Sequence, residues 1–145
     1  MELIQATTKD IQTLLEIEKT TIGLKLYSGY FNEKEVEEYV KKSIVFLIKN
    51  NKDIVGSISY DVIGSDHADI SDLVIKQEFQ KQGFGRKAME LLFEKLRDHK
   101  KLSLCVHPDN HARKLYESFG FKVESRKENY FGDGEPRLIM TKQQD

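Results

Sequence analysis

Residues 80–86 (QKQGFGR) constrain the fold of this chain more than any other stretch of it. They lie between an apolar run at 73–75 (LVI) and a helical pattern that predicts a helix over 83–99. A strand that feeds a helix through a glycine-containing turn leaves the first N–H groups of the helix without internal partners, and the helix dipole adds positive potential there. Because glycine has no β-carbon, an anion can approach these N–H groups closely. The stretch therefore predicts a cradle for a phosphate-like anion.

The spacing of the two glycines excludes two common phosphate-binding motifs. Gly83 and Gly85 are followed by Arg86 and Lys87 and preceded by Lys81, which adds positive charge at the same place. The spacing is neither that of the NTPase loop G-x-x-x-x-G-K-[ST] nor that of the dinucleotide fingerprint G-x-G-x-x-G. The simpler alternative is that the glycines only permit a tight turn, but the strand–turn–helix context favours a binding role.

Composition limits the classes of protein to consider. The 145 residues suit one domain over 1–145, and the formal net charge of −1 gives no bulk attraction to nucleic acid or to an anionic membrane. Cys105 is the sole cysteine, which excludes an internal disulfide and suits a reducing compartment. Neither a signal peptide nor a membrane-spanning run is expected. We expect a cytoplasmic protein, either a monomer or a homodimer, that binds no nucleic acid, membrane or metal.

The hydrophobic pattern predicts an α/β fold. Strands are expected at 3–6, 43–48, 54–63, 68–75, 102–106, 121–125 and 138–140. Helices are expected after the cap cluster 7–10, after Asn32, over 83–99, and in a short segment that ends at Gly120. A loop is expected at 23–31. The order β-α-α-β-β-β-α-β-α-β-β predicts a mixed sheet of about seven strands with helices on both faces.

Two further blocks accompany the glycine turn. Residues 107–121 (HPDNHARKLYESFGF) are similar to an N-x-x-A-x-x-x-Y-x-x-x-G-F segment, and residues 128–140 form a second block around ENYF and LIM. Together with the element order, these blocks resemble the GNAT superfamily of N-acetyltransferases over nearly the whole chain, most strongly at 68–121. The second block is similar to the C-terminal hairpin of the branch that acetylates ribosomal-protein alanine and other N-terminal amines.

The resemblance implies acetyl-CoA as the co-substrate. In the family, the turn that corresponds to 82–87 binds the pyrophosphate through main-chain N–H groups, and the preceding strand pairs with the pantetheine arm. The residues that it assigns to acetyl-CoA here are Leu73, Val74, Ile75, Lys81, Gln82, Gly83, Phe84, Gly85, Arg86, Lys87 and Asn110. Asn110 departs from the family pattern because it lies six rather than seven residues before the tyrosine. Either the turn is one residue shorter, or Asp109 takes the asparagine's place.

Tyr116 stands where the family places its general acid. A phenol with a pKa of about 10 is protonated at neutral pH and can donate a proton to a leaving thiolate. A backbone N–H near 74–75 can stabilise the developing oxyanion. From the spacing alone, a core residue of an amphipathic helix is the better explanation of Tyr116, and only the family match favours the acid role.

The general base is left open by the sequence. Members of the N-terminal-amine branch carry a glutamate on the fifth strand, where this chain has Leu104 or Cys105. The candidates are Asp72, His107 and Glu128, or a chain of water molecules that leads to a backbone carbonyl. His107 has the most suitable unperturbed pKa, about 6.5.

The function that these features indicate is acetyl transfer from acetyl-CoA to a primary amine, by direct attack in a ternary complex. The acceptor is expected to be a peptide or protein N-terminus, or alternatively a small amine such as a polyamine or aminoglycoside. A non-catalytic module that binds acyl-CoA is a second class, kept open by the missing glutamate. A nucleic-acid-binding domain that uses the basic turn would bind in a salt-sensitive way, and the near-zero net charge disfavours it.

Overall fold

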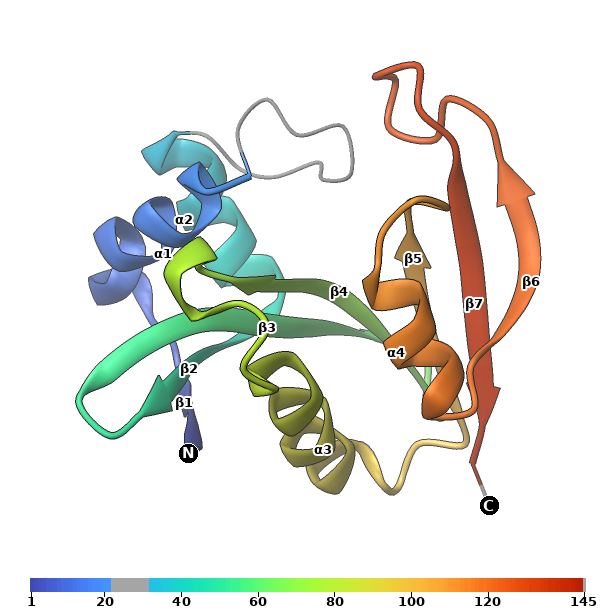
Figure 1. The fold of residues 1–145 in the computed structure, drawn as a ribbon, viewed down its shortest axis with the longest axis horizontal. Helices are drawn as coiled ribbons and strands as arrows, with labels where there is room; N and C mark the ends of the chain where they lie inside the picture. The colour runs from blue at the N-terminus through green and yellow to red at the C-terminus, as the bar shows by residue number, and fades with distance from the viewer. Residues whose placement is uncertain (22–31, 145) are drawn as a thin grey trace.

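A seven-stranded mixed sheet runs through the computed structural model, which describes residues 1–21 and 32–144 (Figure 1). The strand order is β1-β2-β3-β4-β5-β7-β6. Strands β4 and β5 run parallel, whereas the other neighbouring strands run antiparallel. The strands are β1 (Glu2–Gln5), β2 (Ile44–Asn50), β3 (Asp53–Ile63), β4 (His67–Ile75), β5 (Lys101–Val106), β6 (Lys122–Lys127) and β7 (Arg137–Gln143).

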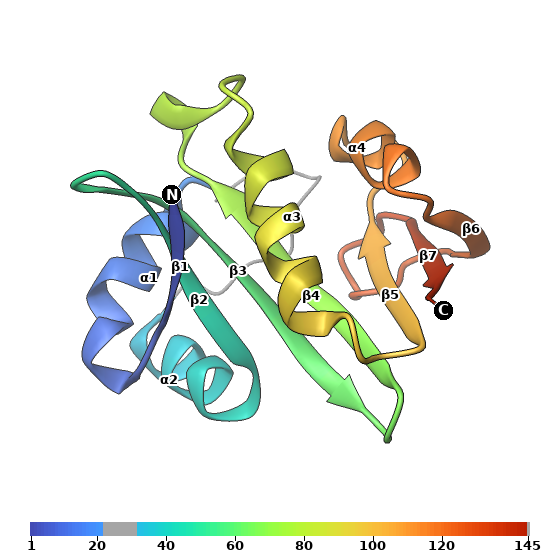
Figure 2. The same ribbon diagram turned by 90° about the horizontal axis from the view of Figure 1, so that it is seen from below.

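Helices cover both faces of this sheet. Helices α1 (Ile11–Lys19) and α2 (Glu33–Lys42) lie on one face, and α3 (Phe84–Leu96) lies on the other (Figure 2). Helix α4 (Ala112–Ser118) shares the core of α3, and two 3-10 turns, η1 (Thr8–Asp10) and η2 (Gln77–Phe79), complete the described elements. The predicted α/β class and element order are therefore confirmed. The loop predicted at 23–31 lies outside the described residues.

Local capping explains where the first helices begin. Thr7 forms a capping box with Asp10 in front of η1, and the Asn32 side chain accepts a hydrogen bond of 2.9 Å from the Glu35 N–H at the start of α2. Both caps lie in positions that the sequence predicts.

Element ends differ from the prediction where tertiary contacts decide them. Helix α3 ends at Leu96 rather than at residue 99, because the chain turns there toward β5. Strand β7 extends to Gln143, beyond the predicted 138–140, because residues 138–143 all pair with β5. Short polar ends of strands carry no periodic signal, and only pairing reveals them.

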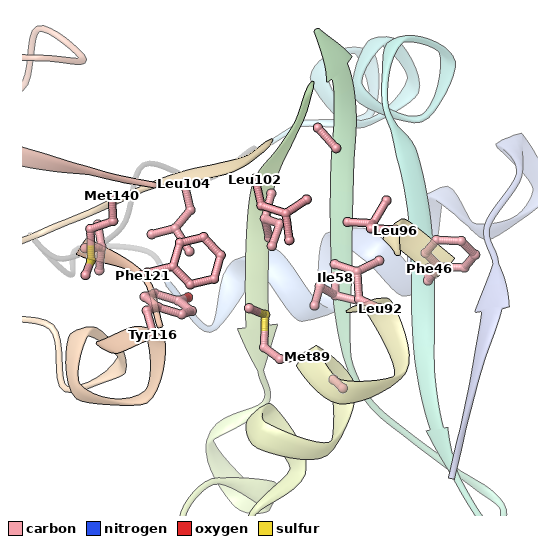
Figure 3. Close-up of a cluster of buried hydrophobic side chains, with 14 of the residues drawn as sticks. Phe46, Ile58, Met89, Leu92, Leu96, Leu102, Leu104, Tyr116, Phe121 and Met140 are labelled. Carbon is pink, nitrogen blue, oxygen red and sulfur yellow. The ribbon is translucent and has the colours of Figure 1, made fainter. Parts of the chain in front are cut away.

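The larger hydrophobic core lies between the sheet and helices α3 and α4. Met89, Leu92 and Leu96 of α3 are fully buried against the sheet (Figure 3). Burial of each such side chain stabilises the fold by about 1.5–3 kcal/mol. Tyr116 of α4 and Phe121 pack in the same core, with their ring centroids 6.2 Å apart. A second cluster joins the opposite face of the sheet to α1 and α2.

Strands β4 and β5 part before either of them ends. Their pairing stops at Ile70 and Leu104, although β4 continues to Ile75. At this point Ser71 is an extra residue in β4, because Ser59 of β3 pairs with Asp72 and the next β3 residue pairs with Ile70. Such a bulge bends the strand that carries it. The second half of β4 is left with β3 on one side and no β5 partner on the other.

The β3–β4 pairing requires a residue without a side chain at position 56. A β-carbon at Gly56 would lie 2.1 Å from the Val74 carbonyl oxygen and 3.0 Å from the Ile75 α-carbon. We therefore expect Gly56→Ala to lower the free energy of unfolding by about 3 kcal/mol, measured by urea denaturation, because backbone atoms must shift. Gly64→Ala is the control: nothing lies within 4 Å there and φ is +74°, so the expected loss is about 1 kcal/mol. Equal losses would contradict the close approach.

Candidate active site

The parting of β4 and β5 opens into a groove of about 490 Å³. Its walls come from the second half of β4, the turn before α3, the first turn of α3, and α4 with the turn that precedes it. The residues that line this groove are Leu73, Ile75, Phe79, Gln80, Lys81, Gly83, Phe84, Gly85, Asn110, His111, Ala112, Leu115 and Tyr116.

A smaller cavity of about 90 Å³, here called the inner chamber, adjoins the groove. The residues that line it are Ile70, Ser71, Asp72, Leu73, Leu104, Cys105, Val106, His107, Asn110, Tyr116, Phe131 and Arg137. Leu73, Asn110 and Tyr116 line both spaces. These three residues therefore mark the junction between the groove and the inner chamber.

The N-terminus of α3 supplies the positive end of the groove. Gly83 precedes the helix with φ +85°, and the first helical hydrogen bond runs from the Lys87 N–H to the Gly83 carbonyl oxygen. The N–H groups before Lys87 therefore have no partner within the helix. The turn is tied to β4 by the Gln80 side chain, whose Nε2 donates to the Ile75 carbonyl oxygen at 3.0 Å.

Gly85 keeps the groove open without being required by the protein's own packing. A β-carbon there would lie 3.8 Å from Leu115 Cδ2 and 4.0 Å from Ile75 Cγ1, which is ordinary van der Waals contact. Its φ is not in the left-handed region. Since neither strain nor a clash explains this glycine, it fits a site in which a bound group occupies the space that a side chain would fill.

The predicted acetyl-CoA residues divide into two groups. Seven of them line the groove: Leu73, Ile75, Lys81, Gly83, Phe84, Gly85 and Asn110. Four do not, namely Val74, Gln82, Arg86 and Lys87. The side chains of Gln82, Arg86 and Lys87 are exposed, and that of Val74 is buried in the cluster under α1 and α2. The backbone of Val74 also faces β3, where Val74 pairs with Ser57, so Val74 does not reach the groove.

Arg86 is held away from the groove. Its Nη2 donates to Ser118 Oγ at 3.1 Å, and its guanidinium lies 5.2 Å from the centroid of the Phe119 ring. The side chain thus joins the start of α3 to α4, and the arginine adds its charge to the N-terminal end of α3 from outside.

Tyr116 and Asn110 lie at the junction, on α4 and on the turn before it. Tyr116 is 8% exposed. Asn110 Oδ1 accepts a hydrogen bond of 2.9 Å from the Ala112 N–H, which shapes the start of α4. Asp109, the alternative in the sequence, is exposed and lines neither space. The shorter turn therefore still places Asn110 at both spaces.

The three candidate bases occupy very different surroundings. Asp72 lines the inner chamber and is half-buried with its Oδ2 fully buried, and this desolvation raises the pKa of its carboxyl. Glu128 is an exposed residue that pairs with Arg126 at 2.8 Å and lines neither space.

His107 is 2% exposed and engaged on both ring nitrogens. Its Nδ1 accepts the Asp109 N–H at 3.0 Å, so the ring proton is assigned to Nε2, which lies 2.8 Å from Glu135 Oε1. This histidine joins the turn before α4 to the loop before β7.

The inner chamber also contains residues that the sequence did not indicate. Arg137 is 2% exposed, donates to the Pro136 carbonyl oxygen at 3.0 Å and to Asp133 Oδ2 at 3.3 Å, and lies over the Phe131 ring. Cys105 faces the same space, and burial raises the pKa of its thiol to about 11. Arginine at the start of a strand is an ordinary surface pattern, so no sequence signal marks this one as buried.

Neither a metal centre nor a membrane helix is found among residues 1–21 and 32–144. No three His, Cys, Asp or Glu side chains in these ranges are grouped so that they could hold a metal ion. Likewise, none of the helices described there is long and apolar enough to cross a membrane.

Comparison with known proteins gives one family. Residues 10–121 match the model of the Acetyltransferase (GNAT) family. The [ribosomal protein bS18]-alanine N-acetyltransferase of Haemophilus influenzae is 30% identical over 137 residues, which cover 90% of each chain.

Solved structures share the fold. The ribosomal-protein-S18-alanine N-acetyltransferase from Escherichia coli has a TM-score of 0.79 at 23% identity, over 98% of this chain and 92% of that one. A GNAT family acetyltransferase from Elizabethkingia anophelis with acetyl-CoA bound has a TM-score of 0.69 at 19% identity, over 77% and 83% of the two chains.

Proposed function

The chain belongs to the acetyltransferase (GNAT) family and is an acetyl-CoA-dependent N-acetyltransferase, and we propose that its acceptor is the N-terminal amine of a peptide or protein. The relative from Haemophilus influenzae, which matches over nine-tenths of both chains, is named for alanine of a ribosomal protein. The observation that carries the proposal is the inner chamber. At about 90 Å³ it admits the amine-bearing end of an acceptor, and the remainder must lie outside.

The groove is the proposed site of acetyl-CoA. The pyrophosphate would be held by backbone N–H groups at 82–87, with Lys81 adding charge at the rim. The unpaired edge of β4 at 73–75 would hold the pantetheine arm as a neighbouring strand would. Val74 would take no direct part, because its side chain packs under α1 and α2 and its backbone pairs with Ser57 of β3.

Tyr116 is the proposed general acid. Acetyl-CoA supplies the thioester, whose thiolate is a leaving group. The Tyr116 hydroxyl, at the junction of the two spaces, would donate its proton to that sulfur, and a backbone N–H near 74–75 would stabilise charge on the carbonyl oxygen. Asn110 lines the same junction and would orient the arm.

A polyamine is the second candidate acceptor. Its terminal amine could enter the inner chamber as an N-terminus does, whereas an aminoglycoside presents its amines on bulky rings. The non-catalytic alternative requires that no amine be acetylated at all. A protein acceptor of the ribosomal kind would place the enzyme in the cytoplasm.

An acceptor screen tests the proposed function. Peptides that begin with alanine should be acetylated at the α-amine, as located by mass spectrometry. The same peptides with a blocked N-terminus and an internal lysine should not react. Acetylation of spermidine without any peptide product would contradict the N-terminal acceptor, and binding of acetyl-CoA without turnover of any amine would support the non-catalytic alternative.

Removal of the Tyr116 hydroxyl tests whether this residue is the general acid. Tyr116→Phe keeps the ring that packs against Phe121, so acetyl-CoA affinity should hold while kcat falls roughly 10²-fold. Tyr60→Phe makes the same change at a ring that stacks on Phe46 and lines neither space, and it should leave kcat unchanged. An unchanged kcat in Tyr116→Phe would reject the acid role.

A methyl group at position 85 tests the groove. Gly85→Ala should weaken acetyl-CoA binding about tenfold in calorimetry, which corresponds to about 1.4 kcal/mol, because the methyl group occupies the groove. The melting temperature of the free protein should hold or rise, since alanine favours a helix over glycine and meets no close atom here. A fall in both quantities would point to misfolding rather than to an occupied site.

A further inference from the structure

A pair of buried carboxyl groups lies beside the inner chamber. Asp72 follows the β4 bulge and lines the chamber, and Glu18 of α1 is 0% exposed. The Glu18 side chain is among the groups that act on the pKa of Asp72, so the two carboxyl groups are neighbours. Two like charges in a buried site cannot both be ionised without a large cost. The pair therefore holds one proton.

Asp72 has an oxygen available for a second proton. Its Oδ2 is buried, and no described N–H or O–H group donates a hydrogen bond to it. Leu73, the next residue in β4, lines both the chamber and the groove. Asp72 thus stands next to the point at which donor and acceptor would meet.

The other described titratable groups of the chamber are unsuited to accept a proton. Cys105 stays a thiol because burial raises its pKa to about 11, and Arg137 is a cation. His107 is bonded through both ring nitrogens, and Tyr116 is needed as the acid. Among the described side chains of the chamber, Asp72 is therefore the one suited to accept a proton.

The geometry points to Asp72 as the general base that takes the proton from the acceptor amine, with Glu18 as the residue that positions its carboxylate. This inference rests on the function proposed above. It assigns a base on β4 to a chain that has Leu104 and Cys105 where a β5 glutamate is expected.

The step balances in protons and electrons. The acceptor's ammonium nitrogen gives one proton to Asp72, and its freed electron pair forms the C–N bond to the acetyl carbon. The C–S bond breaks, its electron pair stays on sulfur, and the Tyr116 hydroxyl supplies the proton that makes the thiol. The amide nitrogen loses its second proton, which restores the Tyr116 hydroxyl, and Asp72 releases its proton to solvent.

The pH dependence follows from the surroundings of Asp72. Desolvation raises its pKa, and the hydrogen bond from Glu18 acts in the opposite direction. Below that pKa Asp72 is protonated and cannot act, so kcat/KM should rise with pH through a value above the ordinary aspartate range. The described titratable or charged groups that face it are Glu18 of α1, Tyr39 of α2 through Ser59, Cys105 and His107 at β5, Tyr116 of α4 and Arg137 of β7.

Asp72→Asn is the decisive variant. With an alanine peptide and with spermidine, kcat/KM should fall about 10²-fold and the acid limb of its pH profile should disappear, while acetyl-CoA affinity holds. Asp69→Asn changes another half-buried aspartate of β4, one that bonds to Ser103 and lines neither space, and should retain activity. Equal activity of the two variants would overturn the proposal in favour of a water chain.

Glu18→Gln tests the positioning role. The amide donates to Asp72 at every pH and never adds a second negative charge, so kcat should be retained and the acid limb should move to lower pH. If the acid limb of the kcat/KM profile stays at the same pH, the positioning role of Glu18 is rejected. A merely structural contact would alter stability without moving this pH profile.

Measurements with both the alanine peptide and spermidine distinguish a failure of the Asp72 proposal from a failure of the proposed function. A wild type that acetylates spermidine alone would reject the peptide acceptor, and the comparison of Asp72→Asn with Asp69→Asn on spermidine would still decide the role of Asp72. If neither acceptor reacts, carbon-13 NMR titration of the carboxyl groups in the free protein decides. An Asp72 that titrates in the ordinary range would then overturn the proposal.

Discussion

The positions of the groove and of the inner chamber depend on the separation of strand β4 from strand β5. Pairing stops at Ile70 and Leu104, where the extra residue Ser71 bends β4 away. A strand edge without a partner exposes backbone N–H and C=O groups, which must be satisfied by something that approaches them. Because α3 starts and α4 passes beside this edge, the same parting creates the groove and the inner chamber, and it places Tyr116 between them.

The two spaces have opposite electrostatic character. The groove ends at the N-terminus of α3, where unpaired N–H groups and Lys81 favour an anion. The chamber lies against the carboxyl pair of Asp72 and Glu18, which favours a proton or an ammonium group. The proposed nucleotide-bearing donor and amine acceptor would thus find complementary surroundings on opposite sides of Tyr116. This separation allows a donor and an acceptor to be bound at the same time, as a ternary complex requires.

Much of the fold could be predicted because its signals are local. Asn32 caps α2 as its position in the sequence indicates, and the glycines at 83 and 85 stand at the start of α3. The roles of Tyr116 and of the residues at 82–87 stay predictions, although the structure brings Tyr116 and Gly85 to one groove. The buried Arg137 was missed, because its burial comes from the loop before β7 and from the Phe131 ring, not from any periodicity.

The amino-acid sequence is sufficient to specify the α/β order, the caps and the glycine turn before α3, since each of these arises from residues within a few positions of one another. The contact between Glu18 and Asp72 is of another kind. It joins a helix near the start of the chain to a strand 54 residues later, and it exists because packing removes both carboxyl groups from water. Register, burial and desolvation are properties of the assembled sheet and helices. For that reason the tertiary structure, through a one-residue bulge at Ser71, selects which acid faces the chamber.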